Sequence, residues 1–151
     1  MTPLRIYLAC SIRGDRSQVP VVRAVADALT RQGHEVLTAR FLDENAENAD
    51  GALTEADVFN RDVAWLENAD VLIAEASGST YGVGFEVGYV LARAGVTGQR
   101  VLLLYQAERR DRISRLISGT TSPQAAVCAY STPAEAVAFV TSRLTEIARR
   151  R

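Results

Sequence analysis

The chain has 151 residues, 48% of them hydrophobic, and its 17 basic and 18 acidic side chains give a net charge of −1. This length and composition suit one globular domain over residues 1–151 and exclude a disordered chain. All basic residues are arginines and the acids nearly cancel them, so we expect no nucleic-acid partner. The apolar runs are far shorter than the ~20 residues of a membrane span, which predicts a cytoplasmic protein with no membrane partner.

Short apolar runs alternate with amphipathic stretches along the chain. The runs predict strands, and each is nearly continuous in apolar residues, as is typical of strands buried on both faces of a parallel sheet. We expect these strands at residues 4–10, 34–38, 70–75, 100–105 and 126–129. The alternation predicts an α/β fold, a flavodoxin-like or Rossmann-like doubly wound five-stranded parallel sheet in the order 2-1-3-4-5, with helices on both faces.

The stretches between the strands have helical periodicity and end signals. Gly33 suits the C-cap of the first helix, Thr54 begins a variant capping box, and Thr132 followed by Pro133 predicts the start of the last helix. We expect helices at residues 19–32, 54–69, 82–94 and 109–117, and from Thr132 into the arginine-rich tail. The connection 39–53 is long, acidic and polar, and we expect it to be an unstructured segment over a site.

Ligands of open parallel sheets bind at the carboxyl ends of the strands, so the loops that follow the strands are the places to search. Residues 11–17 after the first strand offer hydroxyls, guanidinium groups and backbone N–H groups that suit a phosphate, although a polar turn capping the next helix has the same composition. The glycine-rich segment 77–88 after the third strand has the wrong spacing and place for a dinucleotide fingerprint. A Rossmann dehydrogenase is therefore disfavoured.

Two carboxylates are candidates for chemistry. At helical spacing Glu86 lies near Gly82, Val83 and Tyr89, where the helix N-terminus favours its charge and desolvation opposes it. Such a competition can tune a nucleophile or a general base, whereas the alternative role is to bind first-turn N–H groups. Asp62 poses the same question on the preceding helix. With a phosphate loop, two carboxylates from different helices would suit cleavage of a glycosidic bond.

Other reactive side chains receive plainer interpretations. His34 follows a C-cap glycine and is expected to be structural, and Trp65 is expected to lie in the core or at an interface. Cys10 and Cys128 lack metal-ligand spacing, so we expect no metal site and no disulfide framework.

Three segments carry a family resemblance: IYLACSIRG at residues 6–14, RDVAWLENADVLIAEAS at 61–77 and YGVGFEVGYVLA at 81–92. Together they resemble the 2′-deoxynucleoside 5′-monophosphate N-glycosidases (the Rcl type) of the nucleoside 2-deoxyribosyltransferase superfamily, over nearly the whole chain. The resemblance implies hydrolysis of the N-glycosidic bond of a deoxynucleoside 5′-monophosphate without a metal or an organic cofactor. The products would be a free base and 2-deoxyribose 5-phosphate.

The resemblance also implies roles for residues. Glu86 would attack the anomeric carbon, Asp62 would orient the sugar and help protonate the departing base, and Tyr7 matches the family's first-strand tyrosine. The phosphate-binding loop falls on Ser11, Ile12, Arg13 and Gly14. Further substrate contacts fall on the third-strand loop and the helix after it, at Thr80, Gly82 and Gly84.

Three positions depart from the family pattern. Thr80 stands where the family has a serine that contacts the phosphate, and Arg40 stands where mammalian-type members have a histidine after the second strand. Family members are homodimers, and the neighbouring chain would contribute Ser114 and Leu116, the latter in place of a methionine. The preferred base stays open.

Other functions compete with this reading. A deoxyribosyltransferase would pass the sugar to a second base instead of water, and a CMP-type N-glycosidase would accept ribonucleotides. A non-catalytic nucleotide-binding or response-regulator-like module is another alternative, because such sheets host many functions. The regulator version is disfavoured because the first strand ends in Ala9, Cys10 and Ser11 without an acid, and the chain has no lysine.

Overall fold

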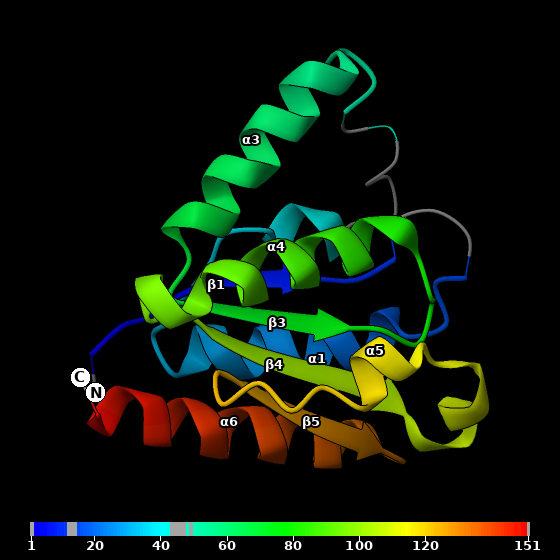
Figure 1. Ribbon diagram of the computed structural model, residues 1–151, viewed down its shortest axis with the longest axis vertical. Coiled ribbons are helices and arrows are strands. Elements are labelled where there is room, and N and C mark those ends of the chain that lie inside the picture. The colour runs from blue at the N-terminus through cyan, green and yellow to red at the C-terminus, as the bar shows by residue number, and fades with distance from the viewer. Residues whose placement is uncertain (1, 12–14, 43–47, 49, 151) are drawn as a thin grey trace.

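The computed structural model describes residues 2–11, 15–42, 48 and 50–150. Its centre is a five-stranded sheet in the order β2-β1-β3-β4-β5, and every neighbouring pair is parallel, which confirms the predicted fold class (Figure 1). The strands are β1 (Arg5–Ala9), β2 (Glu35–Val36), β3 (Val71–Glu75), β4 (Arg100–Gln106) and β5 (Ala125–Tyr130).

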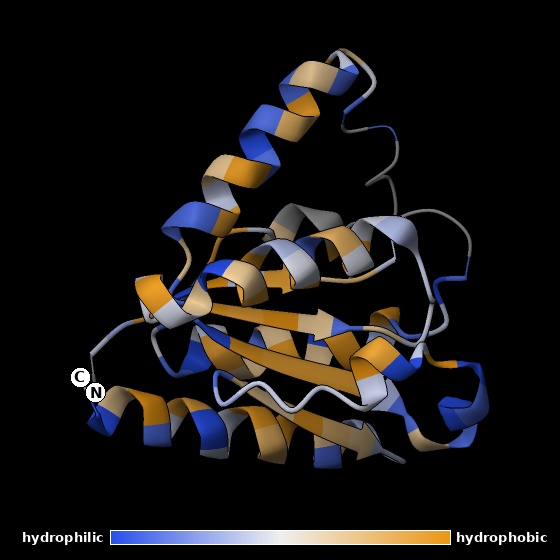
Figure 2. Cartoon of the chain, in the orientation of Figure 1, coloured by the Kyte–Doolittle hydropathy of each residue, from blue (hydrophilic) through white to orange (hydrophobic). Residues whose placement is uncertain are grey.

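Helices cover both faces of the sheet. On one face α1 (Val19–Arg31) and α6 (Pro133–Arg149) pack side by side, and on the other lies α4 (Tyr81–Thr97) (Figure 1). The helix α3 (Glu55–Asn68) leaves this layer, and its N-terminal end extends away from the body. The strands between the layers are largely apolar, as Figure 2 shows.

The alternation of side chains along β1 divides the core in two. Ile6 and Leu8 pack with α1 and α6, whereas Tyr7 and Ala9 face α4 and the end of α3. All four side chains are at most 2% exposed. The tyrosine that the resemblance singled out therefore lies on the face of the sheet that α4 covers.

The predicted end signals are found at the helices. Gly33 adopts φ +81° after α1, and Thr54 and Asp57 form a reciprocal capping box at α3. Thr132 caps α6 by accepting a hydrogen bond from the N–H of Glu135. The helix α4 continues to Thr97, three residues beyond the expected end, because Gly98 with φ +74° ends it.

The expected helix at 109–117 is wrong. The chain forms a 3-10 helix, η2 (Ala107–Arg112), and then a short helix, α5 (Arg115–Ser118). Ile113 separates them in an extended conformation and is only 5% exposed, so burial of this side chain interrupts the helical path. Ser114 then caps α5 by accepting a hydrogen bond from the N–H of Leu116.

The connection 39–53 is also more ordered at its start than expected. It begins with a 3-10 helix, η1 (Ala39–Leu42), whose Leu42 side chain joins the core. The Arg23 guanidinium on α1 holds this segment by donating to the Leu42 carbonyl at 2.6 Å. Within the described ranges, no helix is long and apolar enough to cross a membrane.

Candidate active site

A tyrosine and a glutamate meet on the face of the sheet that α4 covers. The Tyr7 hydroxyl donates a hydrogen bond to Oε1 of Glu86 at 2.6 Å, which joins β1 to α4 across 79 residues of sequence. Tyr7 is wholly buried and Glu86 is half-buried. The core packing of β1 and α4 therefore fixes the direction of the glutamate side chain.

Burial and neighbouring charge tune this pair. Burial raises the pKa of Glu86, the Tyr7 hydrogen bond lowers it and the negative charge of Asp62 raises it, and together they bring it to about 7. Burial and the same two carboxylates raise the pKa of Tyr7, so its hydroxyl keeps its proton and donates. At neutral pH a large fraction of Glu86 is a poorly solvated carboxylate, the form a nucleophile requires.

Asp62 reaches this region from α3 and is held by an arginine. Nε of Arg61 donates to Oδ1 of Asp62 at 2.8 Å, and the same guanidinium pairs with Asp50 at 2.7 Å. Burial raises the pKa of Asp62, whereas Arg61 lowers it. The Arg61 guanidinium lies 4.9 Å from the centre of the Trp65 ring, so Trp65 supports the arginine that orients Asp62.

Arg61 and Asp50 were missed by the sequence analysis. Asp50 lies 11 residues before Arg61, in the connection ahead of α3, and nothing in the local pattern links the two. The contacts of His34 agree with the expected structural role, because its Nδ1 accepts a hydrogen bond from the N–H of Leu4 at 3.2 Å inside the fold. The side chain of Arg40 lies outside what the structure describes.

The turns after β1 and β3 touch each other. Ser11 follows β1 and is 1% exposed, and a Cβ on Gly78 would lie 2.8 Å from the Cβ of Ser11. Ile12, Arg13 and Gly14 of the expected phosphate loop lie outside the described residues. The far side of that loop is anchored, because Arg109 pairs with Asp15 and donates to Oγ of Ser17 at 3.0 Å.

The other expected substrate contacts lie at the start of α4. Thr80 caps this helix, with its hydroxyl oxygen 3.5 Å from the N–H of Val83. A Cβ on Gly82 or Gly84 would meet no atom within 4 Å, so both glycines face open space. The structure thus places these residues around the end of the helix that carries Glu86.

Ser114 and Leu116 lie across a groove from this helix end. The groove has a volume of about 730 Å³ and is lined by Thr80, Gly84, Phe85, Ser114 and Leu116 among others. Three of its apolar side chains are exposed, Tyr81 at 100%, Phe85 at 50% and Leu116 at 86%. One protomer therefore presents Ser114 and Leu116 outward on an apolar surface.

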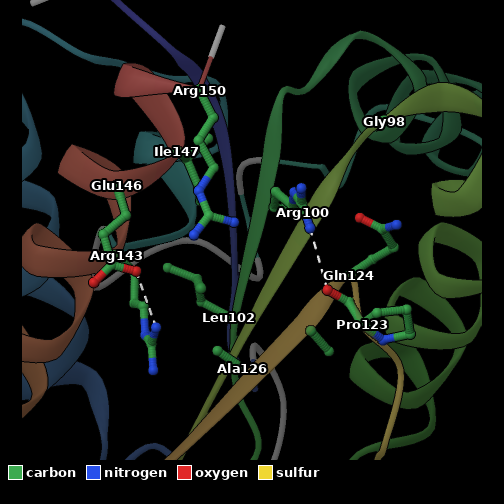
Figure 3. A pocket seen from close by; sticks show the side chains of 11 residues that line it. Gly98, Arg100, Leu102, Pro123, Gln124, Ala126, Arg143, Glu146, Ile147 and Arg150 are labelled. Carbon is green, nitrogen blue, oxygen red and sulfur yellow. Dashed lines mark hydrogen bonds and ion pairs between the residues drawn. The ribbon is translucent and has the colours of Figure 1, made fainter.

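A second cavity, of about 280 Å³, lies at the opposite, amino end of the sheet (Figure 3). Two of the arginines that line it contact protein groups, since Arg100 donates to the Pro123 carbonyl at 3.2 Å and Arg143 pairs with Glu146 at 3.0 Å. None of the candidate site residues that the structure describes lines this cavity. Among the same described residues, no group of three or more histidine, cysteine or acidic side chains could hold a metal ion.

Comparisons with known proteins identify the family. The sequence model for nucleoside 2-deoxyribosyltransferases matches residues 6–123. The chain belongs to this family. It is 39% identical over 141 residues to a protein of Thermofilum pendens named as a 2′-deoxynucleoside 5′-phosphate N-hydrolase. The aligned residues cover 93% of this chain and 95% of the Thermofilum pendens protein.

Two other proteins, one matched by sequence and one by structure, are also similar to this chain. The 5-hydroxymethyl-dUMP N-hydrolase of Mus musculus is 33% identical over 121 residues, which cover 79% of this chain and 67% of the mouse protein. The structure of a CMP N-glycosidase from Clostridium botulinum superposes with a TM-score of 0.68 at 17% identity, over 92% of this chain and 98% of that one. At that identity the structural likeness shows the fold alone.

Proposed function

We propose that this nucleoside 2-deoxyribosyltransferase family member hydrolyses the N-glycosidic bond of 2′-deoxynucleoside 5′-monophosphates. The products are a free nucleobase and 2-deoxyribose 5-phosphate. The observation that carries the proposal is the contact between Tyr7 and Glu86 beneath α4, with Asp62 near enough to raise the pKa of Glu86. Relatives named as N-hydrolases of deoxynucleoside 5′-phosphates support it.

The proposed chemistry assigns one step to each side chain. Oε2 of Glu86 attacks the anomeric carbon while Tyr7 stays bonded to Oε1, and the carbon–nitrogen bond breaks with its electron pair on the base. The reacting form is the one in which Asp62 holds a proton and Glu86 is ionised, and Asp62 gives that proton to the base; burial favours protonated Asp62 because it raises the pKa. Water then attacks the glycosyl-enzyme, returns a proton to Asp62 and frees the Glu86 carboxylate.

The substrate phosphate supplies binding energy at a distance from the reacting carbon. We assign its recognition to Ser11, Ile12, Arg13 and Gly14, with Thr80 from the neighbouring turn and Gly82 and Gly84 leaving room for substrate. The contact between Gly78 and Ser11 supports this, because it brings the two turns together at one end of the sheet. Binding energy from the phosphate would hold the anomeric carbon against Glu86.

A homodimer belongs to the same proposal, with Ser114 and Leu116 of one chain completing the site of the other. Its support is the apolar groove beside α4, where Tyr81, Phe85 and Leu116 are exposed to solvent in the single protomer. Exposed apolar side chains gathered in one groove are typical of an interaction surface. We also place the protein in the cytoplasm, a proposal that its two free cysteines support.

A deoxyribosyltransferase is the second candidate, because the matching family is described by that activity. It uses the same glycosyl-enzyme but lets a second base take the sugar. Incubation of a deoxynucleotide with a different free base distinguishes the two, since only a transferase yields the exchanged nucleotide.

The decisive experiment is chromatographic detection of base release from deoxynucleoside and ribonucleoside 5′-monophosphates and from their unphosphorylated nucleosides. We expect release from the deoxynucleotides and its loss in Glu86→Gln. The matched control is Glu146→Gln, which removes an exposed carboxylate on α6 and should retain activity. Release from ribonucleotides would instead indicate a ribonucleotide N-glycosidase, and full turnover by Glu86→Gln would contradict the assigned nucleophile.

A further inference from the structure

One buried carboxylate has no part in the proposed chemistry. Glu75 is the last residue of β3 and is 1% exposed. Its Oε1 accepts the hydroxyls of Ser77 at 2.5 Å and of Tyr130 at 2.8 Å, and its Oε2 accepts the N–H of Ser77 at 3.1 Å. Ser77 in turn accepts the backbone N–H of Gln106 at 2.8 Å, so this side chain links the ends of β3, β4 and β5.

Such burial is unfavourable for a charge. It raises the pKa of Glu75, while the bonds from Ser77 and Tyr130 and the positive charge of Arg109 act against the rise. A buried ionic group is weak as a source of stability, because an apolar side chain in its place avoids the desolvation penalty. Stability therefore does not account for the contacts of Glu75, and we look instead to the backbone segment that these contacts hold in place.

That backbone is the turn from Ser77 to Thr80. Ser79 lies in the left-handed region at φ +49°, where a residue with a Cβ is held only by its surroundings. Gly78 lies close against Ser11, since a Cβ added at position 78 would lie 2.8 Å from the Cβ of that serine. The turn ends at Thr80, which caps the helix that carries Glu86.

We propose that Glu75 is a positioning residue, which fixes the turn through Ser77 and thereby places the hydroxyl of Thr80 for contact with the 5′-phosphate of the substrate. The inference rests on the proposed function, in which Thr80 contacts that phosphate. It predicts a selective defect, because a displaced Thr80 affects substrates that carry a phosphate and leaves the reacting carbon and Glu86 unchanged.

The test uses Glu75→Gln and Ser77→Ala, each measured on a deoxynucleoside 5′-monophosphate and on the same deoxynucleoside without phosphate. Glu75→Gln keeps the shape but turns an amide toward groups that now donate to a carboxylate. We expect KM for the nucleotide to rise about 10-fold in either variant, the equivalent of about one charged hydrogen bond. We expect KM for the nucleoside and kcat for both to change less than about 2-fold.

Two controls separate positioning from general destabilisation. Glu35→Gln removes an exposed carboxylate on β2 and should change neither KM. Tyr130→Phe removes a donor to Glu75 from β5 but leaves both hydrogen bonds between Glu75 and Ser77, so it should lower the melting temperature without separating the two KM values. Equal changes in KM for nucleotide and nucleoside, or no change in either KM, would overturn the inference. One folded variant of Glu75→Gln and Ser77→Ala is enough for this test.

A failure of the proposed function gives a different result. If the wild type releases base from no nucleotide, calorimetric Kd values for adenosine 5′-monophosphate and adenosine replace the KM values. A loss of affinity in Glu75→Gln confined to the phosphorylated ligand supports the positioning role without catalysis. An equal loss for both ligands contradicts it.

Discussion

At Glu86, three influences act on one carboxyl group. Burial raises its pKa, the hydroxyl of Tyr7 lowers it and the charge of Asp62 raises it, and together they bring it to about 7. A nucleophile must be ionised, so kcat/KM should rise as the pH increases through about 7. In the proposed reaction, Tyr7 thus acts by its effect on the charge of Glu86 as well as by holding the side chain in place.

Replacement of Tyr7 by phenylalanine tests this role. Loss of the hydrogen bond removes the influence that lowers the pKa of Glu86, so the acidic limb of the kcat/KM profile should move upward by about one pH unit. Activity at pH 7 should then fall by about 5-fold, because the ionised fraction of Glu86 drops from about one half to about one tenth, whereas at pH 9 it should change little. The profile of each enzyme is recorded on the same substrate, so that titration of the substrate phosphate is common to both. An equal loss at every pH would show that Tyr7 acts without altering the pKa.

The residue scale also shows what sequence alone could supply. Glu86 and Asp62 stand out because carboxylates at those helical positions need an explanation, and the family resemblance adds Tyr7. Arg61 and Glu75 could not be found in this way, because each also has a distant partner, Asp50 and Tyr130, which lie 11 and 55 residues away and are brought near only by the folded chain. Glu75 was counted only as the end of an apolar strand.

Among the elements, α3 depends most on its own ends. Leu66 is its one buried residue among those described, and the capping box of Thr54 and Asp57 lies at the end that extends from the body. A helix with little tertiary packing relies on its caps and local bonds. The same helix carries Arg61 and Asp62, so its order matters to the site.

Thr54→Ala should lower the free energy of unfolding by about 1 kcal/mol, because it removes the oxygen that caps the Asp57 N–H. Urea denaturation measures the change. The comparison variant is Thr145→Ala on α6, whose hydroxyl bonds a carbonyl within the helix and caps nothing, with an expected change below about 0.5 kcal/mol. Losses of the same size in both variants would mean that the capping box contributes little.

The elements also show where sequence patterns succeed and fail. Apolar runs located all five strands, because buried parallel strands carry that pattern. The helix expected at 109–117 failed for a tertiary reason, since Ile113 turns into the protein and breaks the helical path. The second strand, expected at residues 34–38, is paired with β1 only at Glu35–Val36. The N–H of Leu37 nevertheless donates a hydrogen bond to the Ile6 carbonyl at 2.9 Å.

For the whole molecule, the proposed dimer can be tested by complementation. Glu86→Gln lacks the nucleophile, and Ser114→Ala lacks the side chain proposed to act in the partner's site. In a mixed dimer, one site combines an intact Glu86 with an intact Ser114 from the other chain. Mixing the two purified variants should therefore raise the activity above the average of the two separate samples.

The control for this experiment is a mixture of Glu86→Gln with wild type. Exchange of chains should leave its activity at the value expected from the amount of wild type, because every chain in this mixture has Ser114. Analytical ultracentrifugation establishes the oligomer in each sample. Absence of any gain in mixtures that do exchange chains would place Ser114 outside the partner's site.

The contact between Gly78 and Ser11 limits how this enzyme could be redesigned. Any side chain at position 78 would begin 2.8 Å from the Cβ of Ser11, so the turns after β1 and β3 cannot both keep their paths. An engineer who seeks another base or sugar can vary the open surface around Gly82 and Gly84, where a Cβ meets nothing within 4 Å. In the proposed site, new specificity is therefore accessible along the start of α4, whereas the junction between the two turns must stay unchanged.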